Sequence, residues 1–203
     1  GDNVLTFNPI GQGYCVSVKN SKLGESFFFN STSGGIQSGT CGVIASTIAG
    51  GNVAGYADGV GTAALFNGPD GIVFDSSGTM FVGDWGCYCI RKISTSTVVT
   101  TFAGSNTYGL ADGPATTAQF RGMGGIVIDQ NNILYVADQH RIRKVTPAGD
   151  VSTLAGSGVA GFANGTGAAA QFQHIQGLNI DAQGNVYVAD TNNHRIRKIT
   201  PAG

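Results

Sequence analysis

The sequence contains few charged residues and few prolines, and it has no long apolar run. Charged side chains make up 11% of its 203 residues, against about 25% in an ordinary soluble domain, which argues against a disordered charged tail, a coiled coil and a long helix. The formal net charge of −1 gives no reason to expect nucleic acid or an anionic membrane surface as a partner. No apolar run approaches the ~20 residues of a transmembrane helix, so no membrane insertion is predicted.

Proline occurs only 5 times and glycine follows no three-residue period, which excludes a collagen-like chain. Glycine itself is abundant, at 33 residues, and a glycine-rich sequence with little charge calls for a search for internal repeats. The first residue is glycine rather than methionine, as expected of a processed or excised product.

Three copies of one repeat occupy the chain from residue 45 onward. Ser-Thr-Ile-Ala-Gly at residues 46–50 is matched by Thr-Thr-Phe-Ala-Gly at residues 100–104 and by Ser-Thr-Leu-Ala-Gly at residues 152–156. The rest of each unit follows in register and ends in a run of the type Ile-Arg-Lys-Ile. The units are residues 45–98, 99–150 and 151–203, whereas residues 1–44 match none of them.

Each repeat contains four short β-rich runs separated by turn residues. The first set comprises residues 71–75, 79–84, 89–94 and 98–103. Four antiparallel strands in a unit of about 50 residues are typical of a β-propeller blade. We therefore predict an all-β fold, a β-propeller with three clear four-stranded antiparallel blades. Between these blades we expect the side chains of Phe66, Phe120 and Phe172.

The most regular part of the repeat is Tyr-Val-Ala-Asp-Thr-Asn-Asn-His-Arg-Ile-Arg-Lys-Ile at residues 187–199. It resembles the signature of the NHL repeat, a propeller-blade family named for an Asn-His-Leu triplet. The Ser-Thr-Leu-Ala-Gly and Gly-x-Ala-Asp-Gly elements resemble the longer variant of this repeat, which is familiar from secreted and cell-surface proteins. The resemblance covers residues 45–203. The triplet departs from the signature at residues 139–141, where two residues are deleted, and at residues 87–89.

Most charged residues recur from unit to unit, whereas a catalytic site is built once. Asp84, Asp138 and Asp190 end equivalent runs, and basic residues follow them. We predict that these carboxylates accept hydrogen bonds from turn amides or from nearby arginines and close the blade turns, with Arg141 and Arg195 as further turn residues. The alternative is a ring of carboxylates around the central channel that collects Ca²⁺, a cation that prefers oxygen ligands.

Three histidines raise the alternative of a zinc site, because the resemblance extends to NHL-like lyases with a histidine-bound metal. His140 and His194 occupy equivalent triplet positions, and the spacing matches no compact zinc motif. His174 is unique to its unit and is the one weak metal candidate, at the entry to a strand that should line the channel. The sequence contains no catalytic motif, so we predict neither enzymatic activity nor a cofactor.

Four cysteines form an even set that favours disulfides. Cys87 and Cys89 stand two residues apart and, in an extended chain, are badly placed to bond each other. Disulfides from Cys15 and Cys41 to this pair would fasten the N-terminal segment to the first blade. The alternatives are four free thiols in a reducing cell and a Cys-x-Cys metal clip.

Residues 1–44 form an atypical N-terminal segment, which is either a degenerate blade or an arm. Strand-like runs occupy residues 14–18 and 26–29. The triplet Phe27-Phe28-Phe29 is the most apolar stretch here and needs burial, in this chain or in a partner.

The repeat pattern leaves the blades incomplete. Residues 43–49 resemble a fourth strand without earlier strands, and the last unit stops before its own fourth strand. Three blades are too few to close a propeller. The alternatives are completion by residues 1–49, two half-propellers in a homodimer, a head-to-tail polymer formed by β-augmentation, and a fragment of a longer protein. The predicted assembly edge comprises Val43, Ile44, Ile48, Arg195, Ile196, Arg197 and Ile199.

Taken together, these patterns favour a non-enzymatic, extracellular structural or interaction module that assembles with other chains through strand complementation. Glycosylation sequons at Asn30 and Asn164 add to the cysteine pattern in favour of a secreted or cell-surface protein. The alternatives are an NHL-like metal-dependent lyase or hydrolase, with Ca²⁺ or Zn²⁺ in the central channel, and a monomeric protein- or carbohydrate-binding module.

Overall fold

The structure is a computed structural model that describes the backbone of residues 3–10, 13–20, 26–30, 35–38 and 45–201 and the side chains of residues 45–201. The chain divides into two compact units, Gly1–Ser46 and Thr47–Gly203. The sequence places the boundary between the N-terminal segment and the repeats at residue 44, two residues earlier. Within the described ranges, no helix is long and apolar enough to cross a membrane.

The first unit contains a four-stranded antiparallel sheet in the order β1-β2-β3-β4. The predicted runs at residues 14–18 and 26–29 fall within its two central strands, and its two outer strands were not predicted. The burial of the Phe27-Phe28-Phe29 triplet lies outside the described side chains. The strands are β1 (Asn3–Ile10), β2 (Gly13–Asn20), β3 (Ser26–Asn30) and β4 (Gly35–Ser38).

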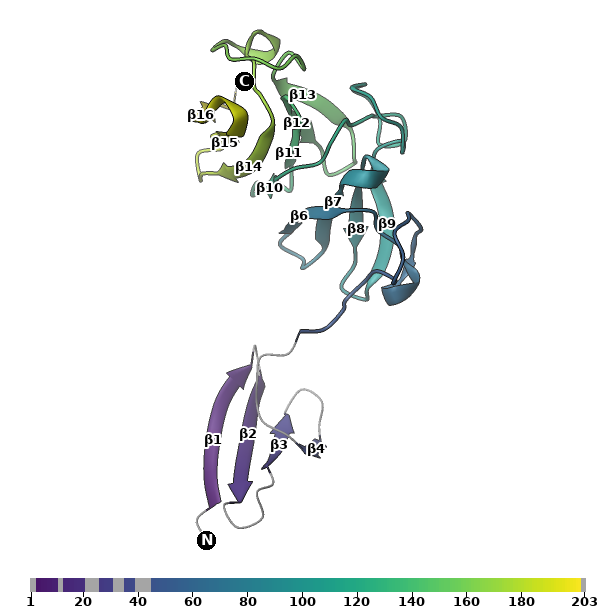
Figure 1. Ribbon diagram of the computed structural model, residues 1–203, viewed down its shortest axis with the longest axis vertical. Helices are drawn as coiled ribbons and strands as arrows, with labels where there is room; N and C mark the ends of the chain where they lie inside the picture. Colours follow the sequence, from purple (N-terminus) through teal and green to yellow (C-terminus); the bar gives the residue numbers. More distant parts are fainter. Residues whose placement is uncertain (1–2, 11–12, 21–25, 31–34, 39–44, 202–203) are drawn as a thin grey trace. The chain divides into compact units, whose positions relative to one another are not determined.

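The second unit consists of three antiparallel sheets that follow one another along the chain (Figure 1). The first sheet has the order β5-β9-β8-β7-β6, the second β10-β11-β12-β13 and the third β14-β15-β16. The strands are β5 (Gly59–Val60), β6 (Pro69–Phe74), β7 (Met80–Asp84), β8 (Cys89–Ile93), β9 (Val98–Ala103), β10 (Ile126–Ile128), β11 (Leu134–Asp138), β12 (Arg141–Val145), β13 (Val151–Ala155), β14 (Ile175–Ile180), β15 (Val186–Asp190) and β16 (Arg195–Ile199).

Each sheet is one propeller blade, as the repeat predicts. The four runs predicted for the first blade coincide with β6, β7, β8 and β9 within two residues at each end. The first strands of the blades, β6, β10 and β14, lie next to one another, and the blades fan out from them (Figure 1). The short 3-10 helices are η1 (Gly61–Ala63), η2 (Trp85–Cys87), η3 (Gly167–Ala169) and η4 (Thr191–Asn193).

The hairpin between the first two strands of each blade is fixed by an aspartate. Asp75 Oδ1 accepts hydrogen bonds from the backbone N–H groups of Ser77 and Thr79, both at 2.9 Å. Gly78 closes this turn with a φ of +84°, which an L-residue rarely adopts. Asp129 and Asp181 repeat the arrangement in the other two blades.

The core lies between the blades rather than inside any one of them. One cluster joins Phe81 and Ile90 of the first blade to Leu134 and Val136 of the second, and a similar cluster joins the second blade to the third. Phe120 is buried in the first of these clusters. Because both faces of a central blade are covered, its strands need few charged residues.

The fourth strand predicted at residues 43–49 is not formed by its described part. Residues 45–49 have no strand conformation, and Ile48 is 53% exposed, while Val43 and Ile44 lie outside the described residues. A strand exists only where a neighbour satisfies its backbone groups, and no described strand is paired with this segment. The short strand β5, which pairs with the outer edge of β9, was not predicted.

Candidate functional site

One arginine in the third strand of each blade is buried. These residues, Arg91, Arg143 and Arg197, have side chains that are 0%, 0% and 10% exposed. They point away from the neighbouring lysines because side chains alternate along a strand. A guanidinium group is buried at little cost only where its donors meet acceptors, so the surroundings of each arginine define a built site.

In the second blade, four acceptors surround Arg143. Its Nη1 donates to Asp138 Oδ2 at 2.7 Å and to the Gln119 carbonyl at 2.8 Å. Its Nη2 donates to Asp112 Oδ1 at 2.6 Å and to the Ala111 carbonyl at 3.0 Å. The arginine therefore ties the end of β11 to the loop that enters the second blade.

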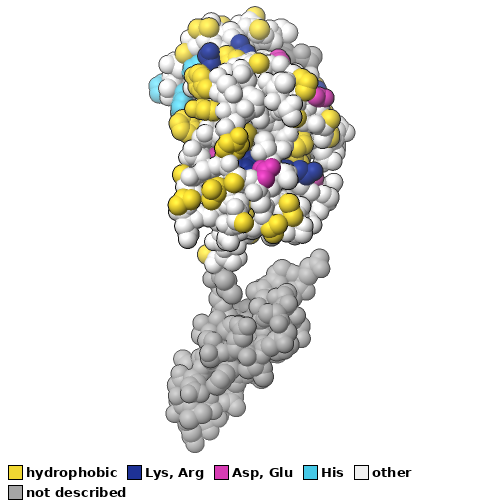
Figure 2. Space-filling view, turned by 90° about the vertical axis from the view of Figure 1, so that its right-hand side faces the viewer, with side chains coloured by type: hydrophobic (Ala, Val, Ile, Leu, Met, Phe, Trp, Pro, Cys, Tyr) yellow, Lys and Arg dark blue, Asp and Glu magenta, His cyan; other side chains and the backbone are white. Residues whose placement is uncertain are grey.

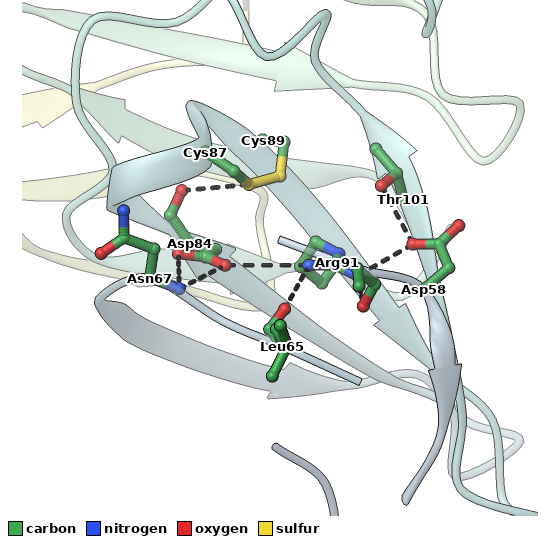
Figure 3. Close-up of a disulfide and its surroundings, with 9 residues drawn as sticks. Asp58, Leu65, Asn67, Asp84, Cys87, Cys89, Arg91 and Thr101 are labelled. Carbon is green, nitrogen blue, oxygen red and sulfur yellow. Dashed lines mark hydrogen bonds and ion pairs between the residues drawn. A yellow bond between two sulfur atoms is a disulfide. The ribbon is translucent and has the colours of Figure 1, made fainter. Parts of the chain in front are cut away.

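The first and third blades repeat this centre with small changes. Arg91 bonds Asp58 at 2.8 Å and the Leu65 carbonyl at 2.9 Å, and it lies 3.8 Å from Asp84 (Figure 3). Arg197 bonds Asp190 and Asn164, each at 2.9 Å.

A phenylalanine ring lies beneath each of these arginines. The guanidinium carbons are 5.2, 5.1 and 4.9 Å from the ring centroids of Phe66, Phe120 and Phe172, respectively. At this distance the ring face attracts the cation. The predicted inter-blade phenylalanines therefore also form one wall of the arginine site.

The carboxylates at the strand ends bind the loop that leads into their own blade. Asp84 accepts the backbone N–H of Asn67 at 3.0 and 3.1 Å, and Asp138 accepts those of Arg121 and Gly122 at 2.7 and 3.1 Å. Burial raises the pKa of both carboxyl groups above the ordinary value, although the amide and arginine donors oppose that shift. Each carboxylate is occupied within its own blade.

Arg141 and Arg195, the arginines named from the signature, do not bond these aspartates. Arg141 donates to the Ser157 carbonyl at 2.8 Å, and Arg195 donates to the Asn193 carbonyl at 2.6 Å and lies 4.0 Å above the ring of Phe162. The sequence carried a signal for the correct set, because the first blade has a cysteine at the equivalent of Arg141 but keeps Arg91.

The turn after β7 contains a disulfide between Cys87 and Cys89 (Figure 3). This corrects the expectation that these cysteines are badly placed to bond each other. That expectation assumed an extended chain, but Tyr88 is left-handed, with φ 51° and ψ 43°, which brings the two Cα atoms to 5.2 Å, within the usual range for a disulfide. The predicted partners, Cys15 and Cys41, lie outside the described side chains.

The histidines do not form a metal site with acidic or cysteine side chains. Across residues 45–201, no group of three His, Cys, Asp or Glu side chains is placed to hold a metal ion. His174 and His140 do meet, because the His174 N–H donates to His140 Nδ1 at 3.1 Å. Burial, together with the nearby His174 and Arg121, lowers the pKa of His140. His194 is exposed on the η4 turn.

The remaining predicted residues lie at the surface or outside the described part. Asn164 is exposed in the loop before β14, and Asn30 ends β3, with its side chain outside the described set. Of the assembly edge, Arg195, Ile196, Arg197 and Ile199 form β16, the last strand of a three-stranded sheet.

Comparisons with known proteins identify the repeat. The family described as NHL repeat matches residues 172–199. NHL repeat-containing protein 2 of Bos taurus is 33% identical over 137 residues, which are 57% of this chain and 19% of that protein. Protein SUPPRESSOR OF QUENCHING 1, chloroplastic, of Arabidopsis thaliana is 41% identical over 78 residues, which are 37% of this chain and 7% of that protein. The chain thus spans less than a fifth of either relative.

A solved structure from Bacteroides thetaiotaomicron, a protein of unknown function, has a TM-score of 0.62 and covers 91% of this chain and 44% of its own. Its sequence identity of 21% means that this likeness concerns the fold alone. The repeated blade, the match at residues 172–199 and the NHL repeat-containing relatives lead to one conclusion: the chain belongs to the NHL-repeat family of β-propellers.

Proposed function

We propose that this chain is a non-catalytic, extracellular propeller module that binds other polypeptide chains, and that it takes a β-strand along the outer edge of its third blade. Equivalent positions in the three blades carry the proposal. Ile196 of β16 is 76% exposed, whereas Ile90 and Ile142 are 0% exposed beneath β9 and β13. An exposed apolar strand edge is a template for pairing with another chain.

A groove runs beside this edge. It has a volume of about 520 Å³ and lies between β16 and the loop that contains Phe162, Asn164 and Ala170. In the two other blades the fourth strand lies at this place. There the hydroxyls of Thr101 and Thr153 donate to Asp58 and Asp112, at 3.2 and 3.0 Å. Asn164, which bonds Arg197, is the equivalent acceptor in the third blade.

The repeat defines the strand that fits the groove. The fourth strands of the first two blades read Val-Thr-Thr-Phe-Ala and Val-Ser-Thr-Leu-Ala, so an incoming strand should place a threonine opposite Asn164. Residues 45–49, Ala-Ser-Thr-Ile-Ala, have this pattern and are exposed. A second copy of the chain therefore offers a matching strand. A strand from any longer polypeptide with the same pattern would fill the groove in the same way.

The extracellular part of the proposal rests on the disulfide in the β7–β8 turn and on the exposed sequon at Asn164, since disulfides persist in oxidising compartments. The absence of catalysis is proposed because the charged groups with unusual surroundings are used up in the copied arginine centres.

The strand proposal is tested with a synthetic peptide of residues 43–50. Hydrogen exchange of the β16 amides should slow when the peptide binds, and a peptide carrying Thr47→Pro should have no effect, because proline removes a donor of the ladder. Ile196→Lys should weaken binding of the unmodified peptide. Amides of β16 that are already protected in a monomeric chain would contradict the proposal, as would equal protection by the proline peptide.

A further inference from the structure

The residues that break the repeat gather at one end of the blades. Trp85, the only tryptophan of the chain, follows Asp84 at the place taken by Gln139 and Thr191 in the other blades. His174 stands where the first two blades have Gly68 and Gly122. The scaffold is copied from blade to blade, whereas a binding site is built once, so this set of exceptions points to a function that the scaffold does not explain.

These residues line one pocket, of about 170 Å³, where the three blades meet. Trp85 contributes an indole ring that is 55% exposed. The polar groups are Asp70 from the first blade, Gln139 from the second, and His174 and Gln176 from the third. Gly122 forms part of the pocket wall, because a Cβ atom there would lie 3.3 Å from Trp85 Nε1 and 3.4 Å from Gln139 Cγ.

His174 adopts a backbone conformation that a glycine would adopt more easily. Its φ is +56°, and Gly68, at the same place in the first blade, has a φ of +88°. Non-glycine residues in the left-handed region are strained, and such strain is concentrated at functional sites. The imidazole is placed by its neighbours, since its N–H bonds His140 and its Nε2 lies 3.4 Å from Gln176 Nε2.

Further aromatic rings extend from the pocket. The Trp85 and Tyr88 rings are 6.4 Å apart, and Tyr88 is 5.5 Å from Tyr108, which is itself exposed. Arg121 lies over Tyr108 at 5.6 Å. The disulfide between Cys87 and Cys89 encloses Tyr88 and so fixes the turn that carries two of these rings. Figure 2 shows histidine side chains at one edge of the second unit, beside apolar side chains.

We infer that this pocket and its aromatic row bind a neutral oligosaccharide. The apolar face of a sugar ring stacks on an exposed indole, and its hydroxyl groups, which both donate and accept, match carboxylate, amide and imidazole groups around the rim. The pocket is small and open, as suits one sugar unit, with following units on Tyr88 and Tyr108. Asp70 is the only charged residue that lines it, so anionic sugars are disfavoured.

Tryptophan fluorescence tests this directly, because the single Trp85 reports on the pocket alone. Cellohexaose, xylohexaose, mannohexaose and chitohexaose are titrated to millimolar concentration, and at least one should shift the emission. Calorimetry with that sugar should show a loss of about tenfold or more for Trp85→Ala and a smaller loss for Trp85→Phe. Tyr56→Ala, at an exposed tyrosine that does not line the pocket, should bind as the unmodified chain does.

His174→Gly separates a binding role from a structural one. Glycine occupies this place in the other blades, so the urea midpoint of this variant should stay equal or rise while sugar affinity falls. Three results would overturn the proposal: no emission change with any of the four sugars, affinity that is unchanged by both Trp85→Ala and His174→Gly, or an emission change produced only by unstructured peptides.

Discussion

Arg143 carries the largest opposing free energies in the molecule. Its side chain and that of Asp138 are both 0% exposed, so each loses its hydration on folding, and the cost is offset only by the hydrogen bonds between them and to the loop. Removing one partner leaves the other charge buried. The centre therefore holds the blade and its entering loop in one arrangement, whatever its net contribution to stability.

Arg143→Met should lower the free energy of unfolding by about 3 to 5 kcal/mol, because it leaves the Asp138 carboxylate without its cation. Lys144→Met, one residue away on the other face of β12, should change it by less than about 0.5 kcal/mol. Urea unfolding measures both. The double variant Arg143→Met/Asp138→Asn should recover part of the loss, and a double variant less stable than Arg143→Met would contradict this account.

His140 makes stability depend on pH. Its pKa in the folded chain lies below the ordinary 6.5, so between the two values the unfolded chain binds more protons than the folded chain. The free energy of unfolding should therefore be unaffected by this group above about pH 6.5 and should fall as the pH drops through the folded pKa. Protonation also occupies Nδ1, which then no longer accepts the His174 N–H.

An NMR titration of the His140 ring measures this pKa, and urea unfolding at about pH 7.5 and about pH 5 measures the consequence. His140→Gln should lose part of the pH dependence. A ring that becomes protonated at or above pH 6.5 would show that the assumed surroundings of His140 are wrong.

At the scale of a structural element, the β7–β8 turn shows how one backbone conformation decides a covalent link. A left-handed Tyr88 brings Cys87 and Cys89 together, and an extended residue there would separate them. The closed loop is very short. Disulfide stabilisation grows with loop length, so this bond serves mainly to fix a local turn rather than to join distant segments.

Replacing both cysteines by serine should lower stability by only about 1 to 2 kcal/mol, as the loop-entropy relation gives for three residues. Thermal unfolding of the variant and of the unmodified chain measures this. Proteolysis without reduction should yield one peptide that contains both cysteines in oxidised form. Recovery of Cys87 or Cys89 linked to a peptide with Cys15 or Cys41 would refute the pairing.

At the scale of the whole molecule, burial depends on which blade a residue occupies. Tyr135 in the second blade is 8% exposed and its equivalent Tyr187 in the third is 36% exposed, although their local sequences are nearly the same. The difference arises because the second blade has a neighbour on each face and a fourth strand. Equivalent residues should therefore make unequal contributions to stability.

Ile142→Ala should cost about 2 to 5 kcal/mol, as expected for a buried isoleucine, whereas Ile196→Ala should cost less than about 0.5 kcal/mol in a monomeric chain. Chemical denaturation at low protein concentration compares the pair. Equal losses would mean that Ile196 is covered in solution, and repeating the measurement with the strand peptide should then raise the cost at Ile196 alone.

The repeat made much of the fold predictable. The strands from β6 to β16 follow from β-rich runs and turn residues that recur in three copies, since each copy meets the same local forces. The sequence also indicated that Asp84 and its equivalents accept hydrogen bonds. It did not single out Arg143, because Ile-Arg-Lys places a buried and an exposed cation side by side and only the direction of the strand tells them apart.

The amino-acid sequence by itself determined the blade, its number of strands and the place of each aspartate, because these depend on local patterns repeated along the chain. Only the tertiary structure decided which arginine is buried, which cysteines bond and where Trp85 meets His174. These depend on backbone angles at single residues such as Tyr88 and on the approach of blades about 50 or more residues apart in sequence, which no local pattern records.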